Sequence, residues 1–524
     1  MTVFRNIDAL INALNGYSSF AFLIAFLLLT ISVFLFSKNR RHSLLFLFLG
    51  SVSIGLAFAL IDPFLNLWDE KFHALVAKNL SDTPLKPHLL NSSVIDSDHR
   101  MWINNYIWLH KPPLSLWQIA LAIKIFGANV LAVRLPSILL HGLTTILTYK
   151  IGKIGFNAQV GFYSAFVFAL LNYPLELISG AHTADHIDVA FIFYITASIW
   201  AWMEYSKTKT LKWAVLLGVF VGLAVLTKWL VGLLVFSGWG VYLLVYRSDN
   251  GMKEWGHLLK SSVIAIIIAA PWFFYTLFAF PNEFMHEMSY NSLHFTNVIE
   301  KHTGDYLFYW DNLKTVYGNG DLIAWIILLS VLFIWKTAKE RKYTLVFYVW
   351  ILLVYSFFTL AQTKMNSFVT IVSPLIILSV VALIVYLTDL IKSNLRFSVN
   401  TLIINTFVSV LLFIFLIRPN EILNNHNLKT KDGIAFKKKL IQTKAFLKTG
   451  LPGKKNDIYF FENTFFYEYI DLMFYHPSLA VNRLPTKDEI KRLTNLGYKV
   501  YVLNNSKKTE AELINKSVTF IKKH

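Results

Sequence analysis

Two adjacent carboxylates close to the end of a long apolar segment are the first residues of this chain that could do chemistry. Asp69 and Glu70 follow Trp68, shortly after the apolar stretch 43–61. A carboxylate at a membrane boundary can act as a general base or bind a divalent cation. The alternative is a structural role, because Asp and Glu also favour the first turn of a helix for dipole reasons. This segment alone does not decide between the two.

Three lysines stand where they could bind an anion. Lys111, with His110 before it and two prolines after it, comes just before an apolar segment, and the prolines restrict its backbone. Lys228 interrupts a long apolar run, where an unpaired charge would be costly, so we expect an anionic partner for it. Lys364 lies in a further turn between apolar segments. Such lysines can pair with a phosphate; the alternative is an interfacial lysine whose charged end reaches water.

A cluster of His and Asp residues precedes another apolar segment. His182, Asp185 and His186 have the i, i+3, i+4 spacing that places them on one face of a helix, and Asp188 follows. That spacing suits a metal site. The alternative, which we favour over a metal, is a polar helix start whose side chains bond locally.

A later segment between apolar runs contributes His302 and Tyr309. The same segment also contains His286, His294 and Asp305. A loop histidine taken singly is more often structural than catalytic. The pattern as a whole is more specific, because three lysines and a carboxylate pair on one side of a membrane suit a substrate with a phosphate head and a lipid tail.

Membrane-spanning helices are the elements that must position these residues. Of 524 residues, 55% are hydrophobic and only 15% are charged, whereas a soluble domain carries about 25% charged residues. Stretches such as 19–36, 264–280 and 369–387 approach the roughly 20 residues that cross a bilayer. The net charge of +18 fits basic cytoplasmic loops better than nucleic-acid binding. The absence of cysteine excludes disulfides, thiolate metal sites and cysteine nucleophiles.

The apolar windows and basic loops together predict about twelve spans. They lie near 18–37, 43–61, 130–149, 158–175, 187–204, 213–226, 230–246, 261–280, 321–335, 343–360, 368–388 and 400–417. All the basic loops fall on one side, taken as cytoplasmic, if both termini face outward. The outer face then holds loops 62–129 and 281–320. We expect the apolar run 113–126 to lie on the outer membrane surface rather than to span.

The C-terminal segment has a different pattern. Short strands are predicted at 457–462, 478–483, 499–504 and 518–521, with helices at 486–495 and 508–515. Alternating strands and helices predict a small α/β domain. The fold class is therefore an all-α polytopic membrane protein, residues 1–418, followed by an extracytoplasmic α/β domain, residues 419–524.

At these residues the sequence resembles the polyprenyl-phosphate-sugar glycosyltransferases of the GT-C superfamily. It is most similar to the bacterial protein-mannosyltransferase-like group, which includes the lipid A aminoarabinose transferases. The residues that carry the resemblance, in the family's order, are Trp68-Asp69-Glu70, His110-Lys111-Pro112-Pro113-Leu114 with Trp117, Phe126-Gly127, Arg134-Leu135-Pro136-Ser137, Asp185 or Asp188, Leu226-Thr227-Lys228, Pro271-Trp272, His302-Thr303-Gly304 with Tyr309, and Lys364 ahead of Pro374.

The chain differs from the aminoarabinose type at two places. Phe72-His73 stands where that type usually has Arg-Tyr, and His110 stands where it usually has Glu. Lys71 is the residue that could replace the missing arginine. Both differences bear on which sugar and which acceptor are used.

The resemblance implies a single inverting displacement at the sugar's anomeric carbon, with polyprenyl phosphate, such as undecaprenyl or dolichyl phosphate, as the leaving group. Asp69 and Glu70 are then catalytic, with Asp69 as the base for the acceptor. The expected substrate-binding residues are His110, Lys111, Asp185, Asp188, Lys228, His302, Tyr309 and Lys364. No cofactor is required, because phosphate is already a good leaving group; a divalent metal is possible, and its candidate ligands are His182, Asp185 and His186.

The same resemblance implies a location in the bacterial inner membrane, with the active site and both termini on the periplasmic side. The acceptor is a hydroxyl or phosphate of lipid A, another glycolipid or a protein. An oligosaccharyltransferase-like or lipid-to-lipid transferase of the same superfamily is the nearest alternative. A multispan transporter or lipid-linked-sugar flippase is the alternative from another class, but we find no repeat or helix broken at the midplane.

Overall fold

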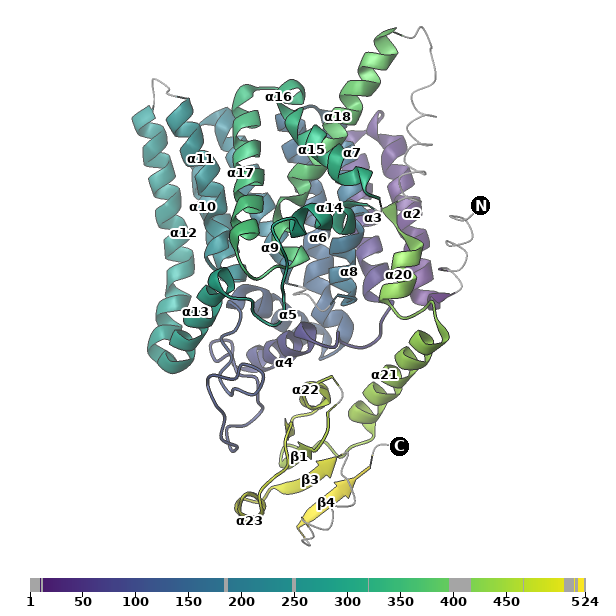
Figure 1. Cartoon of the computed structure of the whole chain (residues 1–524), viewed down its shortest axis with the longest axis vertical. Helices are drawn as coiled ribbons and strands as arrows, with labels where there is room; N and C mark the ends of the chain where they lie inside the picture. Colours follow the sequence, from purple (N-terminus) through teal and green to yellow (C-terminus); the bar gives the residue numbers. More distant parts are fainter. Residues whose placement is uncertain are drawn as a thin grey trace.

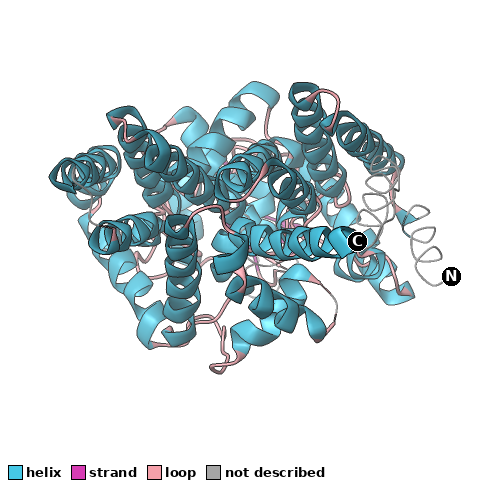
Figure 2. Ribbon diagram, turned by 90° about the horizontal axis from the view of Figure 1, so that it is seen from above, coloured by secondary structure: helices cyan, strands magenta, loops and turns pink. Residues whose placement is uncertain are grey.

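The fold is a bundle of long helices with a small sheet-containing unit at one end (Figure 1). The computed structural model describes residues 10, 13–182, 187–246, 251–318, 320–394, 416–464, 466–503, 513 and 517–522. Seen from above, the long helices stand side by side in an elongated array (Figure 2).

The bundle is built from the following helices. They are α2 (Gly16–Phe36), α3 (Arg40–Ala59), α4 (Asp69–Asp82), α5 (Pro113–Phe126), α6 (Val130–Gly155), α7 (Ala158–Ala169), α8 (Asn172–Ser179), α9 (Asp188–Thr208), α10 (Leu211–Lys228), η1 (Trp229–Leu233), α11 (Leu234–Val245), α12 (Gly251–Ala279), α13 (Pro281–Thr296), α14 (Phe308–Tyr317), α15 (Leu322–Leu332), α16 (Ile334–Thr337), α17 (Arg341–Leu360), η2 (Asn366–Val372) and α18 (Ser373–Asn394).

Eight helical stretches of the described residues are long and apolar enough to cross a membrane, or up to nine if the bent pair α14–α15 is one span. The prediction of about twelve spans differs at three places. Helix α9 is not among the eight, because it carries charges near both ends and many Ser, Thr, Tyr and Trp residues. The stretch Leu211–Val245, which was predicted as the two spans 213–226 and 230–246, is counted as one candidate span. Most of the predicted span 400–417 lies outside the described residues.

Helices α10 and α11 nevertheless run in opposite directions. The amine of Lys209, just before α10, bonds the hydroxyl of Tyr242 near the end of α11 at 2.7 Å. Helix α10 also approaches α12 closely, because a Cβ on Gly218 or Gly222 would collide with α12 backbone. Small residues four apart are the usual means by which membrane helices make such close contacts.

The basic loops gather at one end of the bundle. The amine of Lys209 pairs with Glu254 at 2.5 Å, and the backbone N–H of Lys339 bonds the carbonyl of Gly155 at 2.7 Å. The first contact joins the α9–α10 connection to the start of α12, and the second joins the α16–α17 connection to the end of α6. Helices α4 and α5 lie across the opposite end (Figure 1).

Helix α5 confirms the predicted helix at 113–126. It has 14 residues, which is shorter than a bilayer span, and begins at Pro113, a residue suited to the first helical position. It ends before Gly127, whose φ of 78° favours glycine. Its position on a membrane surface stays a prediction.

The C-terminal part contains a four-stranded parallel sheet of order β2-β1-β3-β4. Its elements are α20 (Pro419–Asn425), α21 (Lys431–Thr449), β1 (Asp457–Phe461), α22 (Glu468–Tyr475), β2 (Leu479–Val481), α23 (Lys487–Asn495), β3 (Lys499–Leu503) and β4 (Val518–Ile521). All four predicted strands and the helix near 486–495 are present. Helix α22 was not predicted, and the predicted helix 508–515 falls almost wholly outside the described residues.

The sheet unit shares one hydrophobic core with α4 and α5. Fully buried Phe72 of α4 and Ile119 of α5 belong to the same cluster as Phe460 of β1 and Met473 of α22. The division of the chain into a membrane domain (1–418) and a C-terminal domain (419–524) therefore stays a prediction, because side chains from both parts pack in one hydrophobic core.

Asp62, in the connection from α3 to α4, anchors the start of the C-terminal part. Its carboxylate meets the ring of His426 at 2.5 Å and the amine of Lys437 at 2.6 Å. Burial alone would raise the pKa of Asp62, but the two basic partners lower it to about 2. The carboxylate is thus charged, and it holds α20 and α21 against the bundle.

The arrangement of basic loops predicts which ends of the helices can be labelled from outside. Since the chain has no cysteine, single cysteines at Lys150, Lys209 and Arg341 should resist an impermeant thiol reagent in intact cells. A cysteine at the exposed Asp305 should react, because positive loops stay in the cytoplasm and this segment lies at the other end of the bundle. Labelling at Lys150 from outside would place the carboxylate end of the bundle in the cytoplasm instead.

Candidate active site

A cavity of about 580 Å³ opens at the end of the bundle covered by α4, α5 and α13. Its walls come from segments far apart in the chain: the start of α4, the connection before α5, the first turn of α9, the end of α10 with η1, helix α13 and the segment 361–371. Asp69, His110, Lys111, Asp188, Lys228 and His302 all line it. The cavity thus collects six of the residues predicted from sequence.

The two adjacent carboxylates point to different surroundings. Asp69 lines the cavity. Glu70 is buried, and Arg134 of α6 holds both of its oxygens, with Nε–Oε1 at 2.7 Å and Nη2–Oε2 at 3.0 Å. The backbone N–H of Asn66 donates a further bond to Glu70 at 2.5 Å. Glu70 does not line the cavity, so the geometry gives it a structural role in place of the expected catalytic one.

Arg134 uses its remaining donors on the chain between α3 and α4. It bonds the carbonyls of Ala59, Asp62 and Phe64 at 2.8, 2.9 and 2.9 Å. Bidentate carboxylate binding combined with several carbonyls suits the planar guanidinium. This network fixes the backbone immediately before Asp69.

Lys228 has the anionic partner that its apolar surroundings required. Its amine is hydrogen-bonded to the carboxylate of Asp188, at the start of α9. The lysine ends α10, and the next residue, Trp229, has a φ of 57° and begins η1. The break in the helix therefore places the amine at the cavity wall, where an incoming anion can share it.

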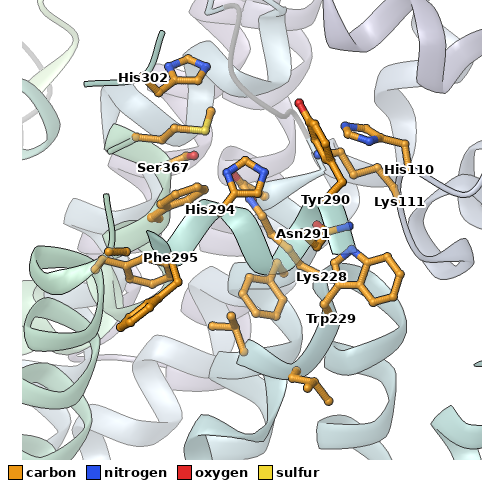
Figure 3. A pocket seen from close by; sticks show the side chains of 18 of the residues that line it. His110, Lys111, Lys228, Trp229, Tyr290, Asn291, His294, Phe295, His302 and Ser367 are labelled. Carbon is orange, nitrogen blue, oxygen red and sulfur yellow. The ribbon is translucent and has the colours of Figure 1, made fainter. Parts of the chain in front are cut away.

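The cavity is rich in basic groups. In Figure 3, His294 lies among the labelled side chains, with His302 on one side and Tyr290, His110 and Lys111 on the other. Burial first, and then the neighbouring charges of Lys111, His110, Lys228 and His302, together lower the pKa of His294 to about 4. Positive groups converging on one point form a site for an anion.

Helix α13 supplies a wall through Tyr290 and His294; the sequence indicated His294 and His286 but not Tyr290. His286, Tyr290 and His294 are spaced by four residues, with ring centroids 6.2 and 5.8 Å apart. This spacing on one helical face was the available signal. Glu287 of the same helix lies 3.1 Å from Nδ1 of His110, whose ring also stacks on Trp102 at 4.5 Å.

Two predicted substrate-binding residues do not line the cavity. The amine of Lys364 donates to the carbonyls of Phe358, Thr359 and Ala361 at 3.0, 2.5 and 2.5 Å, at the C-terminal end of α17. Tyr309 is buried, with the Lys364 amine 5.9 Å from its ring centroid. The positive charge stabilises the helix end, as cations do there. The backbone N–H of Lys364 also bonds the carbonyl of His302 at 3.0 Å, so Lys364 positions a cavity residue.

The candidate metal ligands are only partly described. Asp185 and His186 lie outside the described residues. His182 lies 3.4 Å from Glu176 and stacks on Tyr173 at 4.8 Å. Among the residues that the structure describes, no group of three or more His, Asp or Glu is arranged to hold a metal ion.

Lys71 faces away from the cavity. Its amine meets the carboxylate of Asp471 at 2.5 Å and the carbonyl of Phe466 at 2.7 Å. Lys71 therefore joins α4 to the C-terminal part and does not replace an anion-binding arginine.

Comparison with known proteins gives matches to lipid-linked-sugar transferases. The family model described as dolichyl-phosphate-mannose-protein mannosyltransferase matches residues 110–275. The undecaprenyl phosphate-alpha-4-amino-4-deoxy-L-arabinose arabinosyl transferase 2 of Pseudomonas fluorescens (strain Pf0-1) is 25% identical over 323 residues, covering 58% of this chain and 53% of that protein. An uncharacterised Aquifex aeolicus protein is 37% identical over 128 residues, 24% of each chain. The chain thus spans about half or less of these relatives.

Solved structures extend the likeness over most of the chain. ArnT from Cupriavidus metallidurans in the apo state superposes with a TM-score of 0.60 at 15% identity, covering 88% of this chain and 92% of that one. The structure of the same protein bound to undecaprenyl phosphate superposes with a TM-score of 0.56 at 16% identity, covering 85% of this chain and 87% of that one. The fold is therefore that of these ArnT structures. In sequence the chain is similar to the undecaprenyl phosphate aminoarabinose transferases over more than half of its length.

Because the Glu70–Arg134 pair is buried, we expect the folded protein to lose much of its stability when either partner is neutralised. Glu70→Gln leaves the buried guanidinium without its counter-charge, which costs about 3–5 kcal/mol. We expect a clearly lower thermal unfolding temperature in detergent. Glu204→Gln is the matched control, because its pair with Lys207 lies at the surface and contributes only about 0.3–0.5 kcal/mol. Equal unfolding temperatures for the two variants would contradict the structural role of Glu70.

Proposed function

We propose that this chain is an inverting glycosyltransferase that moves a sugar from a polyprenyl phosphate to an envelope acceptor at the outer face of the bacterial inner membrane. The observation that carries the proposal is the single cavity, in which Asp69 and a group of basic side chains meet beside an apolar wall. Phe191, Leu230, Phe357 and Phe358 belong to that wall. A carboxylate, an anion site and an apolar surface match an acceptor, a phosphate and a lipid chain.

The comparisons support the same donor. Two Pseudomonas fluorescens relatives are named as undecaprenyl phosphate aminoarabinose transferases, and ArnT has been crystallised with undecaprenyl phosphate. An undecaprenyl or dolichyl phosphate sugar is therefore the proposed donor. The acceptor remains open between lipid A, another glycolipid and protein, through a hydroxyl or a phosphate.

The reaction follows from the placement of the charges. The acceptor oxygen forms a bond to the anomeric carbon while the bond from that carbon to the phosphate oxygen breaks. An acceptor hydroxyl gives its proton to Asp69, and the electron pair of the broken bond leaves on the phosphate. Lys111 and Lys228 stabilise the negative charge that grows there. Attack opposite to the leaving group inverts the anomeric centre.

Selective substitution separates the two halves of this mechanism. Asp69→Asn removes the base, so transfer in vesicles supplied with donor should fall by at least about 100-fold, with donor binding retained. Lys111→Met removes one charge-assisted contact to phosphate, which should lower activity tens- to hundreds-fold through both donor affinity and kcat, at about 1.5–3 kcal/mol. The acceptor KM should change little.

Lys228→Met needs its own control, because it leaves the buried Asp188 without its partner. The double variant Lys228→Met with Asp188→Asn removes both charges. It should unfold at a higher temperature than Lys228→Met alone, but its affinity for the donor should stay below that of the unmodified chain. Recovery of normal donor affinity in the double variant would make Lys228 structural. Sugar movement across vesicles without a glycosidic product would favour the flippase alternative.

The lowered pKa of His294 predicts that the protein takes up a proton when phosphate binds. Its pKa of about 4, below its ordinary 6.5, means that the ring is neutral at about pH 5.5 in the empty cavity. An anion arriving among its basic neighbours raises that pKa, so the ring should gain up to about one proton. Calorimetry with farnesyl phosphate in two buffers of different ionisation enthalpy measures this uptake.

The comparison between variants isolates the contribution of His294. His294→Gln should take up fewer protons than the unmodified chain, since any proton exchanged by the phosphate itself is common to both. His286→Gln, on the same helix but not lining the cavity, should behave like the unmodified chain. Identical uptake in His294→Gln would show that the proton goes elsewhere.

A further inference from the structure

Four aromatic rings meet where the C-terminal part touches α4. Trp68 and Phe72 belong to the start of α4, Trp102 to the connection before α5, and Tyr467 to the turn before α22. The ring centroids of Trp68 and Tyr467 are 4.9 Å apart, those of Phe72 and Tyr467 5.2 Å, and those of Phe72 and Trp102 5.0 Å. Phe72 is fully buried beneath the other three, which keep part of their surface exposed. Trp68 also lines the cavity, directly beside Asp69.

The turn that carries Tyr467 is held in an unfavourable backbone conformation. Phe466 and Tyr467 have φ values of 49° and 57°, in the left-handed region that residues with side chains rarely adopt. The amine of Lys71 bonds the carbonyl of Phe466 at 2.7 Å and the carboxylate of Asp471 at 2.5 Å. Such strain persists only where the surroundings impose it, and it gathers at functional sites. Lys71 is thus a positioning residue for the ring of Tyr467.

The chemistry of these rings suits a sugar. The faces of Trp and Tyr rings carry partial negative charge and attract the polarised C–H groups of a pyranose, while their rigid amphipathic shape adds contact area with little entropy loss. Tyr290, Asn291 and Glu300 line the same cavity and can bond sugar hydroxyls. Burial raises the pKa of Tyr467, and Glu300 adds to that shift, so the carboxylate lies within electrostatic reach of the ring.

We propose that Tyr467, with Trp68 and Trp102, forms a subsite for a sugar ring of the acceptor, so that the C-terminal part takes part in acceptor selection. This inference rests on the proposed function. The subsite is assigned to the acceptor because Trp68 directly precedes Asp69, which we propose as the base. A glycolipid acceptor is therefore favoured over a protein. Trp102 stacks on His110, next to Lys111, so a donor sugar on the same rings is the competing assignment, and it would show as a change in the donor KM.

Acceptor kinetics test the subsite. Tyr467→Ala should raise the KM for a purified lipid A acceptor roughly threefold to tenfold, while the KM for the polyprenyl-phosphate sugar donor stays unchanged. Tyr467→Phe keeps the ring and should remain close to the unmodified chain. Tyr498→Ala is the matched control, since Tyr498 packs on the same core but belongs to neither the ring cluster nor the cavity. An equal rise in donor KM, or no change in the acceptor KM, overturns the proposal.

Photocrosslinking tests contact without requiring activity. Replacing Tyr467 by benzoylphenylalanine in cells and irradiating should give an adduct whose mass shows a sugar-bearing lipid, and the same replacement at Tyr498 should not. Adducts with protein alone, or with lipids that lack sugar, overturn the subsite. If the unmodified chain transfers no sugar to any acceptor, the proposed function fails, and the crosslink then decides the subsite on its own.

Discussion

The buried ion pair between Glu70 and Arg134 is the interaction on which the site depends most. A guanidinium taken out of water must be matched in charge and in hydrogen bonds, and Arg134 satisfies this with one carboxylate and three backbone carbonyls. Its partners all come from the segment between the end of α3 and the first turn of α4. That segment is therefore fixed, and Asp69, one residue before Glu70, is directed into the cavity. The pair thus holds one carboxylate in the protein interior while its neighbour lines the cavity.

The rest of the cavity uses charge in the opposite way. Lys111, Lys228, His110 and His302 stand close enough to His294 that their charges, added to burial, lower its pKa. Asp188 is paired with Lys228, and Glu287 with His110. Asp69 and Glu300 line the same cavity. In the low dielectric of a partly buried site, the basic groups around His294 favour an anion beside them. The apolar wall fits a lipid chain, and the two together fit the lipid phosphate that we propose as the donor.

Sequence patterns predicted the elements much better than their contacts. The apolar windows gave most of the long helices, and the alternation of short strands gave all four strands of the sheet, because hydrophobic periodicity is a local property. The need of Lys228 for an anionic partner was also predictable, since charge burial is a strong constraint. The partner itself was not, and neither was the division of labour between Asp69 and Glu70. Both depend on side chains brought together by packing, such as Arg134, which lies 64 residues from Glu70.

Helix α13 illustrates the same limit from another direction. His294 was grouped with other loop histidines and Tyr290 was not considered, because nothing local indicated that these two side chains would line a cavity. Lys364 shows the reverse error: a lysine in an outward turn suggested a phosphate ligand, but its amine is used on the carbonyls that end α17. A single charged residue in a sequence does not reveal whether its partner is substrate or backbone.

The core shared by α4, α5 and the parallel sheet has a consequence for biogenesis. The ribosome makes Phe72 and Ile119 long before it makes Phe460 and Met473, yet these side chains are buried against one another's elements. During synthesis the apolar face of α4 therefore stays without this partner, exposed or covered by lipid or a chaperone, until the sheet has been made. The packing around α4, whose first residue Asp69 lines the cavity, is consequently completed among the last steps of maturation, after the long helices have formed.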